Sequence, residues 1–155
     1  LSQVKKSDKP YIKRLKVLGR VLALDYGDVK IGVALSDPMK IIAKPLKVIL
    51  NSSLENVLIE LKELIESYEV EKIIVGLPIT LKNRKSIQTN KVIAFISFIT
   101  KRISIKIESY DERLTSKIAT QSLIFQGVKT GHNKQEIDKT AAAIFLQNYL
   151  DEFKK

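Results

Sequence analysis

The sequence predicts an α/β domain in which a mixed five-stranded sheet, with three antiparallel strands followed by parallel strands, is flanked by helices. Short aliphatic runs rich in Ile and Val recur along the chain, as in the interior of a sheet. Turn residues separate the first three runs, whereas segments of helical periodicity separate the later ones, and such crossovers join parallel strands. The expected element order is βββαβαβαα.

The first three strands are expected to form an antiparallel unit. They are the runs Arg20–Tyr26, Lys30–Ser36 and Ala43–Leu50. Gly27 and Asp28 join the first two runs as a hairpin, because Gly tolerates positive φ and both flanks favour strands. Pro45 lies near the start of the third run, which predicts a position where a missing backbone N–H is tolerated.

A first crossover follows these strands. Ser52 and Glu55 have the spacing of a capping box, and apolar residues at helical spacing extend from there to about Tyr68. The run Lys72–Leu77 is then predicted to be a buried strand, which Pro78 ends. This strand should lie parallel to its partner in the sheet.

A second crossover and two further helices complete the chain. Helical spacing predicts a helix over Ser86–Thr100, and the isoleucines that alternate with polar residues over 103–107 predict a strand. That strand leads into YDERLTS at 110–116. The last helices are expected near Ser116–Gln126 and over Glu136–Leu150.

Composition limits the classes of protein that fit. At 155 residues the chain has room for one domain, expected over 18–155, preceded by a basic N-terminal tail at 1–17. The chain contains no Cys, which excludes disulfides and thiolate metal sites. No apolar span reaches about 20 residues, so no membrane helix is expected, and the N-terminus lacks the apolar segment of a secretory signal. We therefore expect a cytoplasmic protein.

The net charge of +10 favours an anionic partner, and its distribution favours nucleic acid. Residues 1–20 contain seven basic residues and one acidic residue. Between Glu71 and Glu108 there are eight basic residues and no acidic residue. Both stretches suit a phosphate backbone. The alternative is that these residues form ordinary solvated surfaces.

Carboxylates follow two of the predicted strands. Asp25 comes at the end of the first apolar run, where it is either a turn residue or the first ligand of a metal site. Asp111 and Glu112 lie just past the last predicted strand, and alternation puts Asp111 on the face of the isoleucines and Glu112 on the opposite face. Alternatively, both acids serve the first turn of the following helix, where negative charge suits the helix dipole.

Asp138 lies on the apolar face of the last predicted helix. At about 100° per residue, Ala141, Ala142, Phe145 and Tyr149 fall within about 60° of it. Desolvating a carboxylate there is costly unless it is paired or bound to a cation. The alanines would let the helix approach the sheet closely and bring Asp138 towards the end of the first strand. The alternative is an acid that merely suits a helix N-terminus.

Four motifs resemble the YqgF family, whose members are also described as Holliday junction resolvase-like proteins or pre-16S rRNA processing nucleases. They are LALDYGDVKIGVALSD at 22–37, IIVGLP at 73–78, YDERLTS at 110–116 and IDKTAAAIFLQNYLD at 137–151. The motifs occur in order and cover the chain from about residue 20 to its end. The resemblance implies a ribonuclease H-like fold, and the element order predicted above is the arrangement of that fold.

The resemblance also implies a set of active-site residues. Asp25, Glu112 and Asp138 are expected to be catalytic and to bind Mg²⁺ or Mn²⁺, and Asp111 is expected to be catalytic beside them. Such ions prefer oxygen ligands, and a pair of them can activate water and stabilise the leaving oxygen in phosphodiester hydrolysis.

Several residues are candidates for contacts with nucleic acid. They are Lys30, Lys82, Arg84, Lys85, Arg113 and Thr115. Thr115 could instead cap a helix. The loop ITLKNRKSIQTN lacks the glycine that the family usually carries after VGLP, which favours binding by charge over a backbone phosphate cradle. His132 is the only histidine and is expected to lie at the surface; the alternative is a role as acid or base near Asp138.

The leading hypothesis is a metal-dependent endonuclease that acts on structured nucleic acid, above all on the ends of precursor 16S ribosomal RNA. One alternative is a Holliday junction resolvase, which would need two active sites and therefore a homodimer, whereas a monomer suffices for RNA trimming. Another is a nucleic-acid-binding factor with little nuclease activity. The actin-like ATPases share the strand, Asp and Gly-turn pattern, but they usually need two such domains to enclose a nucleotide.

Overall fold

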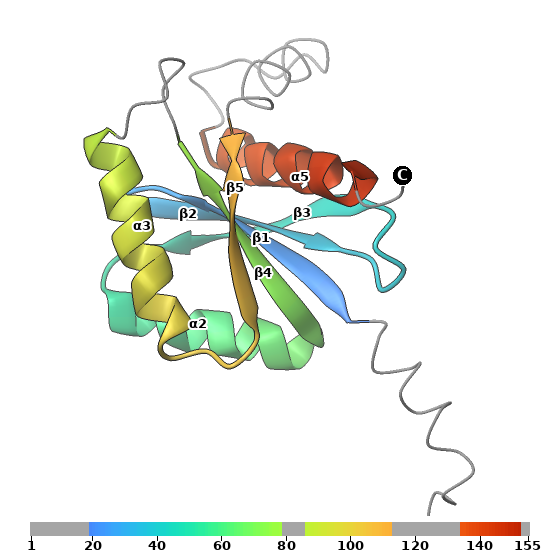
Figure 1. Ribbon diagram of the computed structural model, residues 1–155, viewed down its shortest axis with the longest axis horizontal. Coiled ribbons are helices and arrows are strands. Elements are labelled where there is room, and N and C mark those ends of the chain that lie inside the picture. Colours follow the sequence, from blue (N-terminus) through green and yellow to red (C-terminus); the bar gives the residue numbers. More distant parts are fainter. Residues whose placement is uncertain (1–18, 79–85, 113–133, 153–155) are drawn as a thin grey trace, which may run out of the picture.

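The computed structural model describes residues 19–78, 86–112 and 134–152, with side chains in the last range described from 141 onward. Five strands form one mixed sheet in the order β3-β2-β1-β4-β5 (Figure 1). The strands are β1 Arg20–Tyr26, β2 Lys30–Ser36, β3 Ala43–Leu50, β4 Val70–Leu77 and β5 Lys106–Asp111. The helices in the described residues are α2 Leu54–Ser67, α3 Ile87–Thr100 and α5 Lys134–Glu152.

The predicted fold class is confirmed. β2 lies antiparallel to both β1 and β3, and β4 lies parallel to both β1 and β5. The last helix extends two residues beyond the predicted range at each end. The helix predicted near 116–126 and the tail at 1–17 lie outside the described residues. No helix in the described ranges has the length and apolar character needed to cross a membrane.

Two hydrophobic cores lie on opposite faces of this sheet. The α5 face is the one covered by α5, and the α2/α3 face is the one covered by the other two helices (Figure 1). Alternation divides the side chains of β1 between the two cores. Leu22 and Leu24 pack in the core of the α2/α3 face, whereas Val21 and Ala23 pack in the core of the α5 face. The central strand is therefore buried on both faces.

The predicted hairpin between β1 and β2 is confirmed, but the expected reason for its glycine was wrong. The φ of Gly27 does not lie in the left-handed region. A Cβ atom at this position would instead lie 2.5 Å from the carbonyl oxygen of Lys30, so the tight turn itself excludes a side chain. Asp28 follows in the turn and forms an ion pair with Lys91 of α3 at 3.2 Å.

The start of α2 differs from the prediction. Ser53 rather than Ser52 is the N-cap, and its Oγ accepts a hydrogen bond from the backbone N–H of Asn56 at 3.1 Å. The predicted capping box of Ser52 and Glu55 is therefore wrong by one residue. The helix itself is confirmed and ends at Ser67, one residue before the predicted end.

Two strands also begin at other residues than predicted. β4 starts two residues earlier, because Val70 already pairs with Arg20 of β1. β5 starts at Lys106 rather than at Ile103, because the N–H of Ile103 still bonds to the carbonyl of Ile99 at the end of α3. Alternation of isoleucines thus predicted the strand correctly but included residues that belong to the preceding turn.

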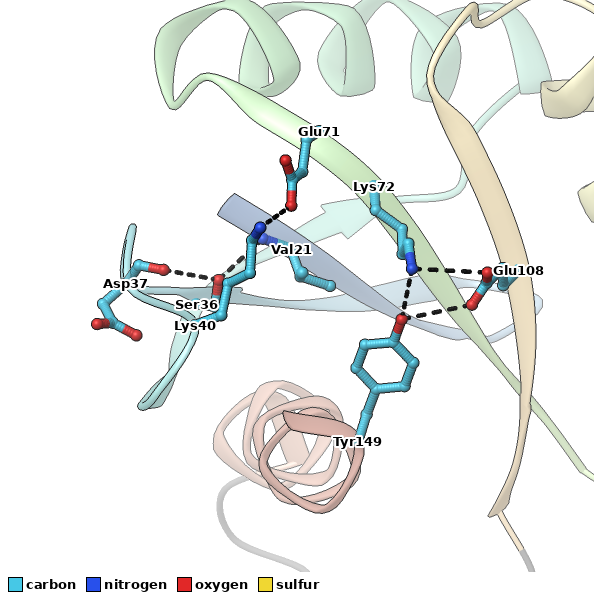
Figure 2. Close-up of polar contacts among 8 residues, drawn as sticks. All are labelled: Val21, Ser36, Asp37, Lys40, Glu71, Lys72, Glu108 and Tyr149. Atoms are coloured by element: carbon cyan, nitrogen blue, oxygen red, sulfur yellow. Dashed lines mark hydrogen bonds and ion pairs between the residues drawn. The ribbon is translucent and has the colours of Figure 1, made fainter. Parts of the chain in front are cut away.

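Ser36 joins β2 to the first residues of β1, and we predict that this serine contributes to stability (Figure 2). Its buried Oγ accepts a hydrogen bond from the N–H of Val21 at 2.8 Å and donates one to the carbonyl of Asp37 at 2.9 Å. Ser36→Ala should lower the free energy of unfolding by about 1–3 kcal/mol, because it leaves a buried N–H without a partner. Denaturant unfolding measures this loss. The exposed Ser52→Ala should stay within about 0.5 kcal/mol, and equal effects of the two variants would contradict the prediction.

Candidate active site

Asp25 lies on the α5 face near the carboxyl end of β1. The alternation that places Val21 and Ala23 in the core of this face also places Asp25 there. Across the antiparallel ladder Asp25 pairs with Gly32 of β2, which has no side chain to crowd it. The turn begins only after Tyr26, so Asp25 is a strand residue and the alternative of a turn residue is wrong.

Glu112 reaches the same face from the far side of β4. Tyr110 of β5 pairs with Gly76 of β4 and packs against the core of the α5 face, whereas Ile107 packs against the core of the opposite face. Glu112 lies two residues beyond Tyr110 and continues this alternation past the end of β5. Its side chain forms a hydrogen bond with Asp25. The structure thus brings together two of the predicted acids that are far apart in the sequence.

The pKa of Glu112 reports how closely these acids are packed. Burial, the charge of Asp25, the hydrogen bond with Asp25 and the charge of Asp111 together raise this pKa to about 8, with burial as the largest cause and the others following in that order. Without a cation, Glu112 therefore holds a proton at neutral pH and shares it with Asp25. Strongly perturbed carboxyl groups of this kind concentrate at functional sites. A cation could replace that proton, because its charge stabilises both carboxylates.

The acid pair has the chemistry of a site for Mg²⁺ or Mn²⁺, which prefer carboxylate oxygens. A Cβ atom on Gly76 would overlap the carboxylate of Glu112, so the bare backbone of β4 leaves room for the pair. Among the described side chains no three Asp, Glu or His residues are arranged so that all three could hold one metal ion. The remaining oxygen ligands would therefore come from water, from substrate or from a side chain outside the described set.

Asp138 lies within α5, but its side chain is outside the described set. The course of α5 can still be followed from later residues. Tyr149 bonds to Lys72 near the start of β4, and Phe145 stacks with Tyr110 near the end of β5, with ring centroids 5.9 Å apart. The helix thus runs antiparallel to these strands. Asp138 is about two turns before Phe145, so its backbone lies further towards the carboxyl ends of the strands.

The apolar face predicted for this helix is confirmed at three of its four positions, whereas Ala141 is only half-buried. Ala142, Phe145 and Tyr149 are buried in the core of the α5 face, and Ala143 is buried beside them. Small residues at 142 and 143 let the helix backbone lie close to the sheet. The helix therefore has the close approach that the alanines predicted.

Among the candidates for nucleic-acid contacts, Lys30 is the one within the described ranges. It opens β2 and precedes Ile31, which packs in the core of the α2/α3 face, so alternation directs Lys30 to the α5 face. It therefore lies on the same face and at the same end of the sheet as Asp25. The other candidates lie outside the described residues: Lys82, Arg84, Lys85, Arg113 and Thr115, as does His132.

A polar cluster that sequence reasoning missed holds α5 to the opposite end of the sheet (Figure 2). Lys72 Nζ donates to Tyr149 Oη at 2.8 Å, and Tyr149 Oη donates to Glu108 Oε2 at 3.4 Å. Lys106 Nζ lies 2.9 Å from Glu108 Oε1. Partial burial lowers the pKa of Lys72, but the hydrogen bond with Tyr149 and the charge of Glu108 outweigh burial and raise it. The sequence did contain one signal for this cluster. A tyrosine, Tyr149, lies on an apolar helix face, and the hydroxyl of a buried tyrosine needs a hydrogen-bond partner.

The strand order is that of the ribonuclease H-like fold, and the acid pair suits a site for a divalent cation. The chain belongs to the RuvX family, whose model carries the description Holliday junction resolvase and matches residues 19–152. The resemblance to the YqgF family drawn from the four motifs is thereby confirmed.

Curated relatives are similar over most of the chain. A protein of Desulforamulus reducens is 42% identical over 132 residues, which is 85% of this chain and 96% of that protein. A protein of Natranaerobius thermophilus is 40% identical over 132 residues, covering 85% of this chain and 94% of the relative. Both carry the name "Putative pre-16S rRNA nuclease".

Solved structures share the fold at low sequence identity. RuvC of T. thermophilus in complex with a Holliday junction substrate has a TM-score of 0.56 at 12% identity and covers 88% of this chain and 96% of that chain. The fowlpox virus resolvase in complex with Holliday junction DNA has a TM-score of 0.52 at 15% identity, and the match covers 88% of this chain and 99% of the resolvase chain. At such identities the likeness concerns the fold alone.

Proposed function

We propose that the protein is a metal-dependent endonuclease that processes the ends of precursor 16S ribosomal RNA in the cytoplasm. The observation that carries this proposal is the hydrogen-bonded pair of Asp25 and Glu112 on one face of the sheet. The names of the relatives support an RNA substrate, and the net charge of +10 suits a phosphate backbone.

Asp25, Glu112 and Asp138 would hold Mg²⁺ or Mn²⁺, with Asp111 beside them. When bound, the cation supplies positive charge to the phosphate and activates water for hydrolysis. Glu112 would be deprotonated with the cation bound, so that both members of the pair would offer carboxylate oxygens. Asp25 is held in the central strand, which fixes its position against the rigid cores.

Basic residues of the chain would bind the phosphates that flank the cleaved bond. Lys30 lies on the face and at the end of the sheet where the acids meet, which suits a contact with the strand being cleaved. We assign the same role to five residues outside the described ranges, namely Lys82, Arg84, Lys85, Arg113 and Thr115. These contacts would position the backbone without reading base sequence.

A second candidate function is resolution of Holliday junctions. The description of the family model and the solved structures bound to junctions favour it. Cutting both strands of a junction needs two active sites, so this function requires a homodimer, whereas a monomer suffices for RNA trimming. A nucleic-acid-binding factor with little nuclease activity is the third possibility.

A side-by-side cleavage assay separates these functions. Precursor 16S RNA ends and four-way DNA junctions are offered to the purified protein with Mg²⁺ or Mn²⁺, and EDTA serves as the metal-free control. We expect cleavage of the RNA that requires the cation. Preferred cleavage of the junction would support the resolvase, and tight binding of either substrate without cleavage would support the binding factor.

A further inference from the structure

We propose that Gly76 is a positioning residue of the active site: the bare backbone of β4 at Gly76 lets the Glu112 side chain cross this strand and meet Asp25. The effect that we expect on metal binding rests on the proposed function.

The need for a crossing follows from the order of the strands. Asp25 lies on β1 and Glu112 follows β5, and β4 lies between these two strands. Neighbouring strands are about 4.8 Å apart, so the backbones that carry the two acids are separated by about twice that distance. The two carboxyl groups can share a hydrogen bond only if a side chain passes over β4.

The register places Gly76 at the point of crossing. Leu24 pairs with Val75, so the next residues along these parallel strands, Asp25 and Gly76, lie at the same level. On its other side Gly76 pairs with Tyr110 of β5. Earlier positions of β4 on the α5 face carry large side chains, namely the half-buried Lys72 and the fully buried Ile74. Gly76 is where this row of side chains stops.

The Glu112 side chain fills the space above Gly76. A Cβ atom at Gly76 would overlap Glu112 Oε1, and it would lie 2.7 Å from Cδ and 3.0 Å from Cγ of the same residue. All three nearest atoms therefore belong to one side chain and none to the backbone. The φ of Gly76 is not in the left-handed region, so an alanine would suit the strand conformation.

An added methyl group should therefore move Glu112 rather than unfold the sheet. Glu112 has three side-chain torsions and can turn away from β4, which separates its carboxylate from Asp25. A purely structural glycine would behave differently, because its replacement would destabilise the protein whether or not Glu112 is present. This difference makes the role testable without any substrate.

The experiment is a double-variant cycle with Mn²⁺ alone as the probe. Gly76→Ala, Glu112→Ala and the double variant are compared with the unchanged protein for Mn²⁺ affinity by electron paramagnetic resonance and for thermal stability without metal. Gly76→Ala should weaken Mn²⁺ binding by about tenfold or more, the range seen for residues that orient metal ligands. In the Glu112→Ala background it should change neither affinity nor stability. Ile74→Val, on the same face of β4, is the control and should bind Mn²⁺ normally.

The outcomes separate this inference from the proposed function. Equal Mn²⁺ affinity of Gly76→Ala and the unchanged protein would overturn the role of Gly76. Absence of Mn²⁺ binding by the unchanged protein would instead overturn the proposed metal site. If Gly76→Ala does not fold, folding of the double variant supports the inference, and failure of both variants overturns it.

Discussion

Replacing Asp25 with Asn should abolish cation-dependent cleavage and leave the fold intact. Asn keeps the shape of the side chain but removes the negative charge that a divalent cation requires. A loss of several kcal/mol of transition-state stabilisation corresponds to a fall in rate of about a thousandfold or more. The measurement is the single-turnover cleavage rate in Mg²⁺, together with the melting temperature without metal.

The melting temperature distinguishes a chemical effect from misfolding. Asp25→Asn removes one of two crowded carboxyl groups, so the metal-free variant should be at least as stable as the unchanged protein. Asp28→Asn is the matched control, because this residue lies three positions away in the exposed turn and pairs with Lys91. The Asp28→Asn variant should cleave at the rate of the unchanged protein. Full activity of Asp25→Asn would remove this residue from the proposed site.

The stability of the metal-free protein should fall as the pH rises from about 4.5 to about 8. The pKa of Glu112 is about 8 in the folded protein and 4.5 as the ordinary value, so in this range the folded state binds a proton that the unfolded state has lost. Stability is therefore fully present below the unfolded pKa and is lost as the pH approaches the folded pKa. The slope due to one proton is about 1.4 kcal/mol per pH unit. Denaturant unfolding at a series of pH values measures it.

Glu112→Gln isolates this titration from the rest of the protein. Gln has a similar shape but binds no proton. The difference in unfolding free energy between the unchanged protein and Glu112→Gln should therefore change with pH by the slope of one proton. Saturating Mn²⁺ should remove the slope as well, because the cation takes the place of the proton. Asp25→Asn should shift the window to lower pH, since the charge of Asp25 contributes to the raised pKa. Parallel stability curves for the unchanged protein and Glu112→Gln would contradict the assignment.

Much of the sheet could be predicted because local patterns dictate it. Aliphatic runs bounded by turn residues defined the first three strands with the bounds that the structure has. Alternation also predicted that Glu112 would lie on the sheet face opposite to the isoleucines. Asp25 lies on that same face as Glu112. The ends of elements were less certain, as at Ser53, because adjacent serines compete for one cap and only the geometry of the turn selects between them.

The closeness of Asp25 and Glu112 could not be derived from local patterns. It depends on the order of strands, which puts β4 between β1 and β5, and on the absence of a side chain at one position of β4. The glycine within KIIVGL was visible as an exception in an aliphatic run, and such glycines often mark a close approach. The cluster of Lys72, Glu108 and Tyr149 was also hidden, because its members come from three elements distant in the sequence.

The division of β1 between two cores also restricts how the length of this strand can change during evolution. Deleting one residue between Leu22 and Asp25 would turn the acid towards α2 and α3. An aliphatic side chain would then occupy the place on the α5 face that Asp25 has now. Substitutions in β1 can be accommodated one at a time, but a single-residue deletion would remove the site at once. Among relatives of this protein, changes in length should therefore occur in the connections and at the edge strand β3, and not between residues 20 and 26.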